Sequence, residues 1–116
     1  MTTRKIEKNE WKAFFDGVSK DGGLSRKCAE IDVISLNLGD QIAAEWVPML
    51  GIVYDPRSDT LEVGLEGLNH LIHRPTTIHV DESAAGLLSI SVNDQDAMQH
   101  IIRLRDPLLL SPPTHT

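Results

Sequence analysis

The sequence predicts a mainly β fold of the α+β class, in which an N-terminal amphipathic helix packs on a curled antiparallel sheet or small barrel of about six strands. Apolar residues recur at helical spacing near the start of the chain, whereas from residue 29 onward they alternate with a period of two. Tight-turn sequences separate the alternating runs. One helix cannot cover both faces of such a sheet, so we expect the sheet to curl around its own core.

Four apolar side chains at positions i, i+3, i+4 and i+7 predict the helix. They are Trp11, Phe14, Phe15 and Val18, and they share one helical face. We expect the helix to end by Asp21-Gly22-Gly23, because glycine readily adopts the left-handed conformation that closes a helix.

Alternation of apolar and polar residues predicts the strands. The clearest hairpin joins residues 50–54 to residues 60–66 through Asp55-Pro56-Arg57-Ser58-Asp59, where Asp opens the turn and Pro presets its backbone. Further strands are expected over residues 29–38, 42–46, 76–82, 88–92 and 98–105.

Three places depart from simple alternation. The apolar parity switches between residues 31 and 36, which indicates a β-bulge or a strand buried on both faces. Pro48 lacks an N–H donor, so it should interrupt its strand or lie at an edge. Residues 68–74 are expected to form one helical turn or an irregular crossover that Pro75 closes.

Length and composition fit one globular domain. The chain has 116 residues, of which 41% are hydrophobic and 24% charged, and we assign residues 1–110 to a single domain and residues 111–116 to a disordered tail. No apolar run approaches the ~20 residues that span a bilayer. We expect a soluble cytoplasmic protein, because the start of the sequence lacks an export signal and Cys28 is the single cysteine.

The charge distribution is uneven. Residues 1–27 have a net charge of +3, whereas residues 28–116 have a net charge of −9, for a total of −6. An acidic body argues against nucleic-acid binding through phosphate neutralisation. The basic segment either packs on the acidic body or extends toward an external anionic partner.

The sequence resembles a family of small bacterial proteins of unknown function. The matching stretches include Arg4-Lys5-Ile6, Glu10-Trp11 with Phe14-Phe15-Asp16, Leu38-Gly39-Asp40-Gln41, Glu45-Trp46-Val47-Pro48-Met49-Leu50-Gly51-Ile52, Tyr54-Asp55-Pro56, and Ile102-Arg103-Leu104-Arg105-Asp106-Pro107-Leu108. The resemblance extends over nearly the whole chain. It implies a bacterial, soluble, single-domain protein and carries no reaction, ligand or catalytic residue.

Candidate ligand-binding residues cluster in the second half of the chain. They are Glu66, His70, His73 and His79, which a curled sheet would bring together at its mouth. His70 and His73 alone do not make a zinc site, because such a site needs three or four ligands. We therefore predict no metal, no cofactor and no catalytic residue.

Candidate interface residues are Trp46, Arg103 and Arg105. The two arginines share one face of the last predicted strand, where they either pair with carboxylates on a neighbouring strand or contact a partner. Trp46 belongs to the core unless the bend at Pro48 exposes it to a partner.

These patterns favour a non-catalytic binding or protein-interaction module, acting on a protein partner or as a homo-oligomer. The recognisable sequence patterns are apolar alternation and turn sequences, and no separate cluster of titratable residues is visible beside them. Two alternatives remain open. One is a small enzyme or ligand-binding barrel with a site near His70 and His73, and the other is an RNA-binding small barrel.

Overall fold

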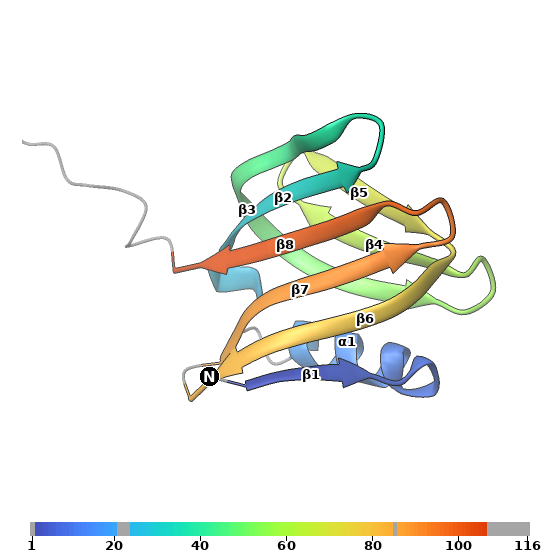
Figure 1. Ribbon diagram of the computed structural model, residues 1–116. Helices are drawn as coiled ribbons and strands as arrows, with labels where there is room; N and C mark the ends of the chain where they lie inside the picture. Colours follow the sequence, from blue (N-terminus) through green and yellow to red (C-terminus); the bar gives the residue numbers. More distant parts are fainter. Residues whose placement is uncertain (1, 21–23, 85, 107–116) are drawn as a thin grey trace, which may run out of the picture.

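Figure 1 shows the computed structural model, which describes residues 2–20, 24–84 and 86–106. The predicted helix end at 21–23 and the predicted disordered tail at 111–116 lie outside these residues. In chain order the elements are β1 (Thr2–Ile6), the 3-10 turn η1 (Lys8–Glu10), α1 (Trp11–Lys20), the 3-10 turn η2 (Leu24–Arg26), β2 (Cys28–Ser35), β3 (Gly39–Asp55), β4 (Thr60–Leu65), β5 (Leu68–His73), β6 (Pro75–Ser83), β7 (Gly86–Asp94) and β8 (Gln99–Arg105).

The eight strands found in the described residues form one antiparallel sheet with the order β1-β6-β7-β8-β2-β3-β4-β5. The mainly β class is confirmed, but the predicted number of about six strands is wrong because β1 and β5 are additional strands. The small barrel is wrong as well, since β1 and β5 are the two edges of the sheet. Figure 1 shows β4 and β5 lying behind β8 and β7, so the sheet folds back on itself without closing.

Strand β3 connects the two layers of the folded sheet. Its first half pairs with β2 as far as Pro48 opposite Cys28, and its second half pairs with β4 from Met49 opposite Leu65. Trp46 has a positive φ of 53°, an uncommon conformation for a bulky residue, just before this exchange of partners. The predicted interruption at Pro48 is therefore wrong. Proline lies at the junction of two ladders, where a missing N–H donor is tolerated best.

The pairing between β2 and β3 is irregular. Its register shifts between Ala29 and Ile31 and again between Ile31 and Asp32. The extra residues lie on β3, because the step from Ala29 to Ile31 spans Val47 to Ala44, and the next step, to Asp32, reaches Ile42. Strand β2 itself pairs with β8 without a shift, so the predicted bulge in β2 is wrong. Strand β2 corresponds to the other sequence-based alternative, a strand buried on both faces: Ile31 faces the core, whereas Asp32 is buried on the opposite face, where Arg103 contacts it.

Helix α1 packs between β1 and the second half of β3. Trp11 and Phe15 are fully buried, which confirms the predicted apolar face, and Trp11 Nε1 donates a hydrogen bond to the carbonyl of Ile6 on β1 at 2.9 Å. At the other end of the helix, Ser19 Oγ accepts from the N–H of Ile52 at 3.0 Å and donates to its carbonyl at 2.9 Å. The helix thus satisfies backbone groups of β3 that face away from β4.

The core lies between the two layers. The predicted hairpin of residues 50–54 and 60–66 is confirmed, and its inward side chains Leu61, Val63 and Leu65 are fully buried. Inward residues of β6, β7 and β8 pack against them and include Ile78, Val80, Ile90, Val92 and Ile102. Burial of each such side chain contributes roughly 1.5–3 kcal/mol.

Candidate functional site

The segment that carries His70 and His73 is strand β5, so the expected helical turn or crossover over residues 68–74 is wrong. It pairs with β4 along its whole length. A spacing of three residues places two side chains on opposite faces of a strand. His70 faces the interior, whereas His73 lies on the outer surface with its Nδ1 3.2 Å from the Thr60 hydroxyl.

The other two candidate ligand residues, Glu66 and His79, point elsewhere. Glu66 is exposed in the turn between β4 and β5. His79 lies on β6 between the buried residues Ile78 and Val80, so its side chain points to the outer face of the sheet. The four candidates do not face a common space, and a ligand site in this segment stays a prediction.

His70 instead contacts a residue that the sequence interpretation did not select. Its Nε2 lies 3.0 Å from Nδ1 of His100 on β8, and the two rings are tilted by 57° with centroids 5.1 Å apart. His100 Nε2 in turn lies 2.9 Å from Oδ2 of Asp94 at the end of β7. Asp94, His100 and His70 therefore form one hydrogen-bonded chain from the β7–β8 turn to β5.

The position of His100 follows from the strand pattern. It is in phase with Ile102 and Leu104, which face inward on β8, and it is 5% exposed. The same alternation that predicts the buried leucine and isoleucine thus predicts a buried histidine, which needs polar partners. No local signal identifies His70 as that partner, because it is thirty residues away in the sequence.

The ring nitrogens determine what this hydrogen-bonded network of Asp94, His100 and His70 can do chemically. With both rings neutral, His70 donates from Nε2 to His100, and His100 donates from Nε2 to Asp94. Burial, followed by the charge of His100, lowers the pKa of His70 to about 4. Burial alone would raise the pKa of Asp94, but hydrogen bonds from His100 and from the N–H groups of Met98 and Asp96 keep it below its ordinary value. These three side chains therefore form a buried network in which protonation of His70 is unfavourable.

Metal binding receives no support from this network. Among the described residues, no group of three or more His, Cys, Asp or Glu side chains is arranged to hold a metal ion. The contacts of His70 and His100 are instead explained by their hydrogen bonds to each other and to Asp94.

Arg103 has the cross-strand partners that the sequence analysis gave as one alternative. One of its terminal nitrogens lies 2.6 Å from Oδ2 of Asp32 and 3.1 Å from Oε1 of Glu30, both on the neighbouring strand β2. Arg103 donates both hydrogen bonds, and they raise its pKa above the ordinary value, the one to Asp32 most strongly. Asp32 is 5% exposed, and its other carboxylate oxygen has no hydrogen-bond partner.

Arg105 and Trp46 contact each other. The Arg105 guanidinium lies over the Trp46 ring, 4.0 Å from its centroid, and Trp46 is partly buried. The stack covers the bend of β3 with the end of β8. A contact between Trp46, Arg103 or Arg105 and an external partner stays a prediction.

An apolar patch lies on the outer surface of β3, β4 and β5, and we call it the outer β3–β5 face. It is defined by Leu50, Val53 and Leu71, whose exposed fractions are 61%, 49% and 46%. Strand pairing places Glu62 between Val53 and Leu71, and Leu50 lies beside Gly64. Clustered exposed apolar side chains are more informative about binding than isolated ones.

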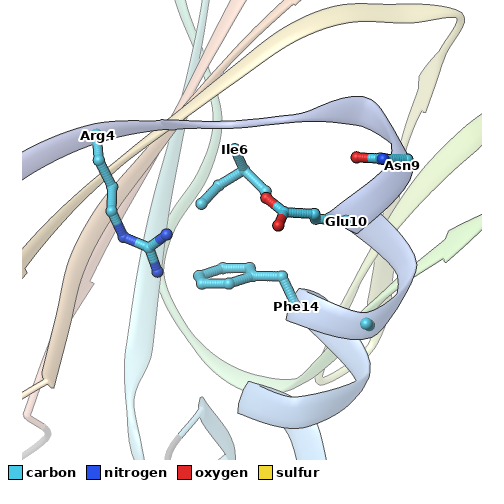
Figure 2. A pocket seen from close by; sticks show the side chains of 6 residues that line it. Arg4, Ile6, Asn9, Glu10 and Phe14 are labelled. Atoms are coloured by element: carbon cyan, nitrogen blue, oxygen red, sulfur yellow. The ribbon is translucent and has the colours of Figure 1, made fainter.

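A hollow lies between β1 and α1 (Figure 2). It has a volume of about 380 Å³ and is lined by Arg4, Ile6, Asn9, Glu10, Ala13 and Phe14. The Arg4 guanidinium lies 5.4 Å from the centroid of the Phe14 ring, and its Nε donates to Glu82 at 2.8 Å. That hydrogen bond raises the pKa of Arg4. Because Glu82 already balances its charge, Arg4 is a weak anchor for an anionic ligand.

The basic N-terminal segment packs on the acidic body, which was one of the two sequence-based alternatives. Strand β1 pairs with β6, and Arg4 contacts Glu82 while the Thr3 hydroxyl contacts the Asp81 carboxylate. Lys8 Nζ lies 3.7 Å from Asp59. Arg4 and Lys8 are thereby paired with carboxylates of the acidic body.

Comparison with known proteins gives the family. The family described as "Family of unknown function (DUF5335)" matches residues 2–113. An uncharacterized protein of Aquifex aeolicus (strain VF5) is 33% identical over 111 residues, which cover 95% of this chain and 98% of that relative. No solved structure matches the chain, and no helix in the described part is long and apolar enough to cross a membrane. The predicted resemblance to a bacterial family of unknown function is confirmed, and the chain belongs to the DUF5335 family.

Proposed function

We propose that this protein is a non-catalytic interaction module that acts as a homodimer joined through strand β5. The observation that carries the proposal is the chemistry of this edge. β5 is an edge strand of six residues, LNHLIH, and has no Lys, Arg, Asp, Glu or Pro in a chain of net charge −6. Monomeric proteins usually protect edge strands with charges or proline. The other edge, β1, has such charges in Arg4 and Lys5.

A second copy of the chain is the partner that fits this edge. Two copies of β5 can pair antiparallel about a two-fold axis, as isologous dimers require. Directly opposed residues must lie on the same face of the sheet, so an axis at Leu71 places this residue opposite Leu71 of the second copy. The same register places Asn69 opposite His73 of the second copy and keeps His70 on the inner face.

The charges near this edge permit self-pairing. Glu62 is the nearest carboxylate in the row that contains Leu71, and it lies one strand further from the proposed axis. The two copies of Glu62 would be three strand spacings apart, about 14 Å. That separation exceeds the Debye length of about 8 Å at physiological ionic strength, so repulsion between them is weak.

The outer β3–β5 face adds apolar contact to the backbone pairing. Leu71 extends this face to the edge of the sheet, and an axis at Leu71 would bring the outer β3–β5 faces of two copies side by side. Backbone hydrogen bonds contribute about 0.5–1.5 kcal/mol each, and contact between the two copies of Leu71 adds to them.

Size-exclusion chromatography with light scattering tests the proposal. At neutral pH we expect a mass twice that of the 12.9 kDa chain. Leu71→Lys places a charge on the edge and should yield monomers. Leu36→Lys is the matched control, because Leu36 is 95% exposed at the β2–β3 turn, and it should leave the dimer intact. A monomeric wild type, or a Leu71→Lys variant as dimeric as the wild type, contradicts the proposal.

A further inference from the structure

We infer that the chain of Asp94, His100 and His70 is a latch that holds β5 against β8, and that acid opens the latch and dissociates the homodimer. The inference rests on the proposed function, because β5 is the strand through which the dimer would be joined. Its structural basis is the only side-chain hydrogen bond recorded between β5 and β8 in the described residues.

The latch connects the two layers of the folded sheet. His70 belongs to the edge strand β5, whose backbone pairs with β4. His100 belongs to β8, in the middle of the opposite layer, where it pairs with Val33 and Val92. His100 and the Asp94 side chain are 5% and 7% exposed. A polar contact is therefore held inside an otherwise apolar interior.

Few titratable groups face His70. Val63 lies opposite on β4, and His100 approaches from β8 with Asp94 behind it. Arg74 and Asp96 form an exposed ion pair between the neighbouring turns at 3.5 Å, where each balances the other.

Two titratable side chains on adjacent strands point away from the latch. Glu62 on β4 and His73 on β5 belong to the outer face, because they alternate with the buried residues Leu61 and Ile72. Burial, followed by the charge of His100, therefore sets the protonation of His70.

The latch opens only when two protons have been added to the His70–His100 pair. With one added proton on the pair, the contact keeps its hydrogen bond, because an Nδ1–H of His100 can donate to Nε2 of His70 while its Nε2–H still donates to Asp94. A second proton on His70 leaves two donors facing each other across the 3.0 Å contact. The hydrogen bond is then lost, and only one of the two positive charges has a carboxylate partner.

Opening the latch affects the proposed interface directly. A charged His70 gains hydration by turning toward solvent, and Leu71 is the next residue in the chain. Movement of the backbone at His70 therefore displaces the residue that would lie on the two-fold axis.

The test measures mass by light scattering from neutral pH down to about pH 4. His70→Gln removes the titrating group, while its amide can donate to or accept from His100. His79→Gln is the matched control on the outer face of β6. We expect the wild type and His79→Gln to change from dimer to monomer on acidification, and His70→Gln to stay dimeric.

Hydrogen exchange of the β5 amides separates failure of the latch from failure of the dimer. A dimer that survives acid, or a His70→Gln variant that dissociates at the same pH as the wild type, overturns the latch. A protein that is monomeric at neutral pH, but in which acid accelerates β5 exchange only when His70 is present, overturns the dimer alone. If His70→Gln does not fold, β5 exchange in the wild type must follow the NMR titration of the His70 ring, and exchange independent of that titration overturns the latch.

Discussion

Nε2 of His70 and Nδ1 of His100 lie 3.0 Å apart, and their hydrogen bond joins the edge strand β5 to strand β8 across the core. The remaining ring nitrogen of His100 is occupied by Asp94. The sheet is therefore held in its folded-back shape by a polar contact as well as by apolar packing, and the contact depends on protonation.

Protein stability should fall on acidification because of His70. Its pKa is about 4 in the folded protein against an ordinary value of 6.5, so the unfolded chain binds the proton first as the pH falls. The stabilisation is complete above pH 6.5 and is lost progressively down to about pH 4. Urea denaturation should give a smaller change over this range for His70→Gln than for His79→Gln. An equal pH dependence of stability in the two variants would refute the assignment of this dependence to His70.

The orientation of α1 predicts unequal effects of two adjacent phenylalanines. Phe15 is fully buried, whereas Phe14 is partly buried beneath Arg4. Phe15→Ala should reduce the free energy of unfolding by about 3–5 kcal/mol, because it leaves a cavity in the core, and Phe14→Ala should cost clearly less. Chemical denaturation of both variants measures the difference, and equal losses would mean that the helix is rotated from the described position.

Ser19 should contribute to stability through the backbone of β3. Its hydroxyl bonds to both the N–H and the carbonyl of Ile52. Ser19→Ala leaves two part-buried backbone groups without their partner, at a cost of about 1–3 kcal/mol. Ser58→Ala, at an exposed turn position, provides the comparison and should be nearly neutral. Thermal denaturation that ranks the two variants the other way would count against this contact.

Arg103 should contribute more to protein stability than Arg105, because Arg103 neutralises a buried carboxylate. Arg103→Met leaves Asp32 buried without a cation, at a cost on the order of 3 kcal/mol. Arg105→Met loses only a stack over Trp46, worth roughly 0.5–1 kcal/mol. The double variant Asp32→Leu with Arg103→Met should recover much of the loss. Urea denaturation measures the stability of each variant, and a double variant no more stable than Arg103→Met would contradict this account.

The sequence predicted those elements whose local pattern agrees with their final environment. Strands β4, β6, β7 and β8 alternate cleanly because one face of each meets the core. Helix α1 was recognised for the same reason. Strand β1 was missed because TTRKI has a single buried apolar residue, Ile6, and it becomes a strand by pairing with β6 rather than by its own pattern.

Strand β5 was missed because its inner face includes a polar residue. In LNHLIH the inward positions are occupied by Leu68, His70 and Ile72, and the outward ones by Asn69, Leu71 and His73. Apolar residues therefore occur on both faces, and the alternation is lost. The histidine fits inside because His100 receives it, and the long separation between the two in the sequence hides this relationship.

Oxidative cross-linking of Leu71→Cys tests the proposed dimer most directly. An axis at Leu71 brings the two Cβ atoms within about 4.5–5.5 Å, close to disulfide geometry, whereas residue 69 lies about 14 Å from its own copy along the strands. We predict that mild oxidation at neutral pH links Leu71→Cys into a covalent dimer and leaves Asn69→Cys monomeric in denaturing electrophoresis. Absence of a covalent dimer from Leu71→Cys, or equal linking of both variants, would contradict pairing through β5.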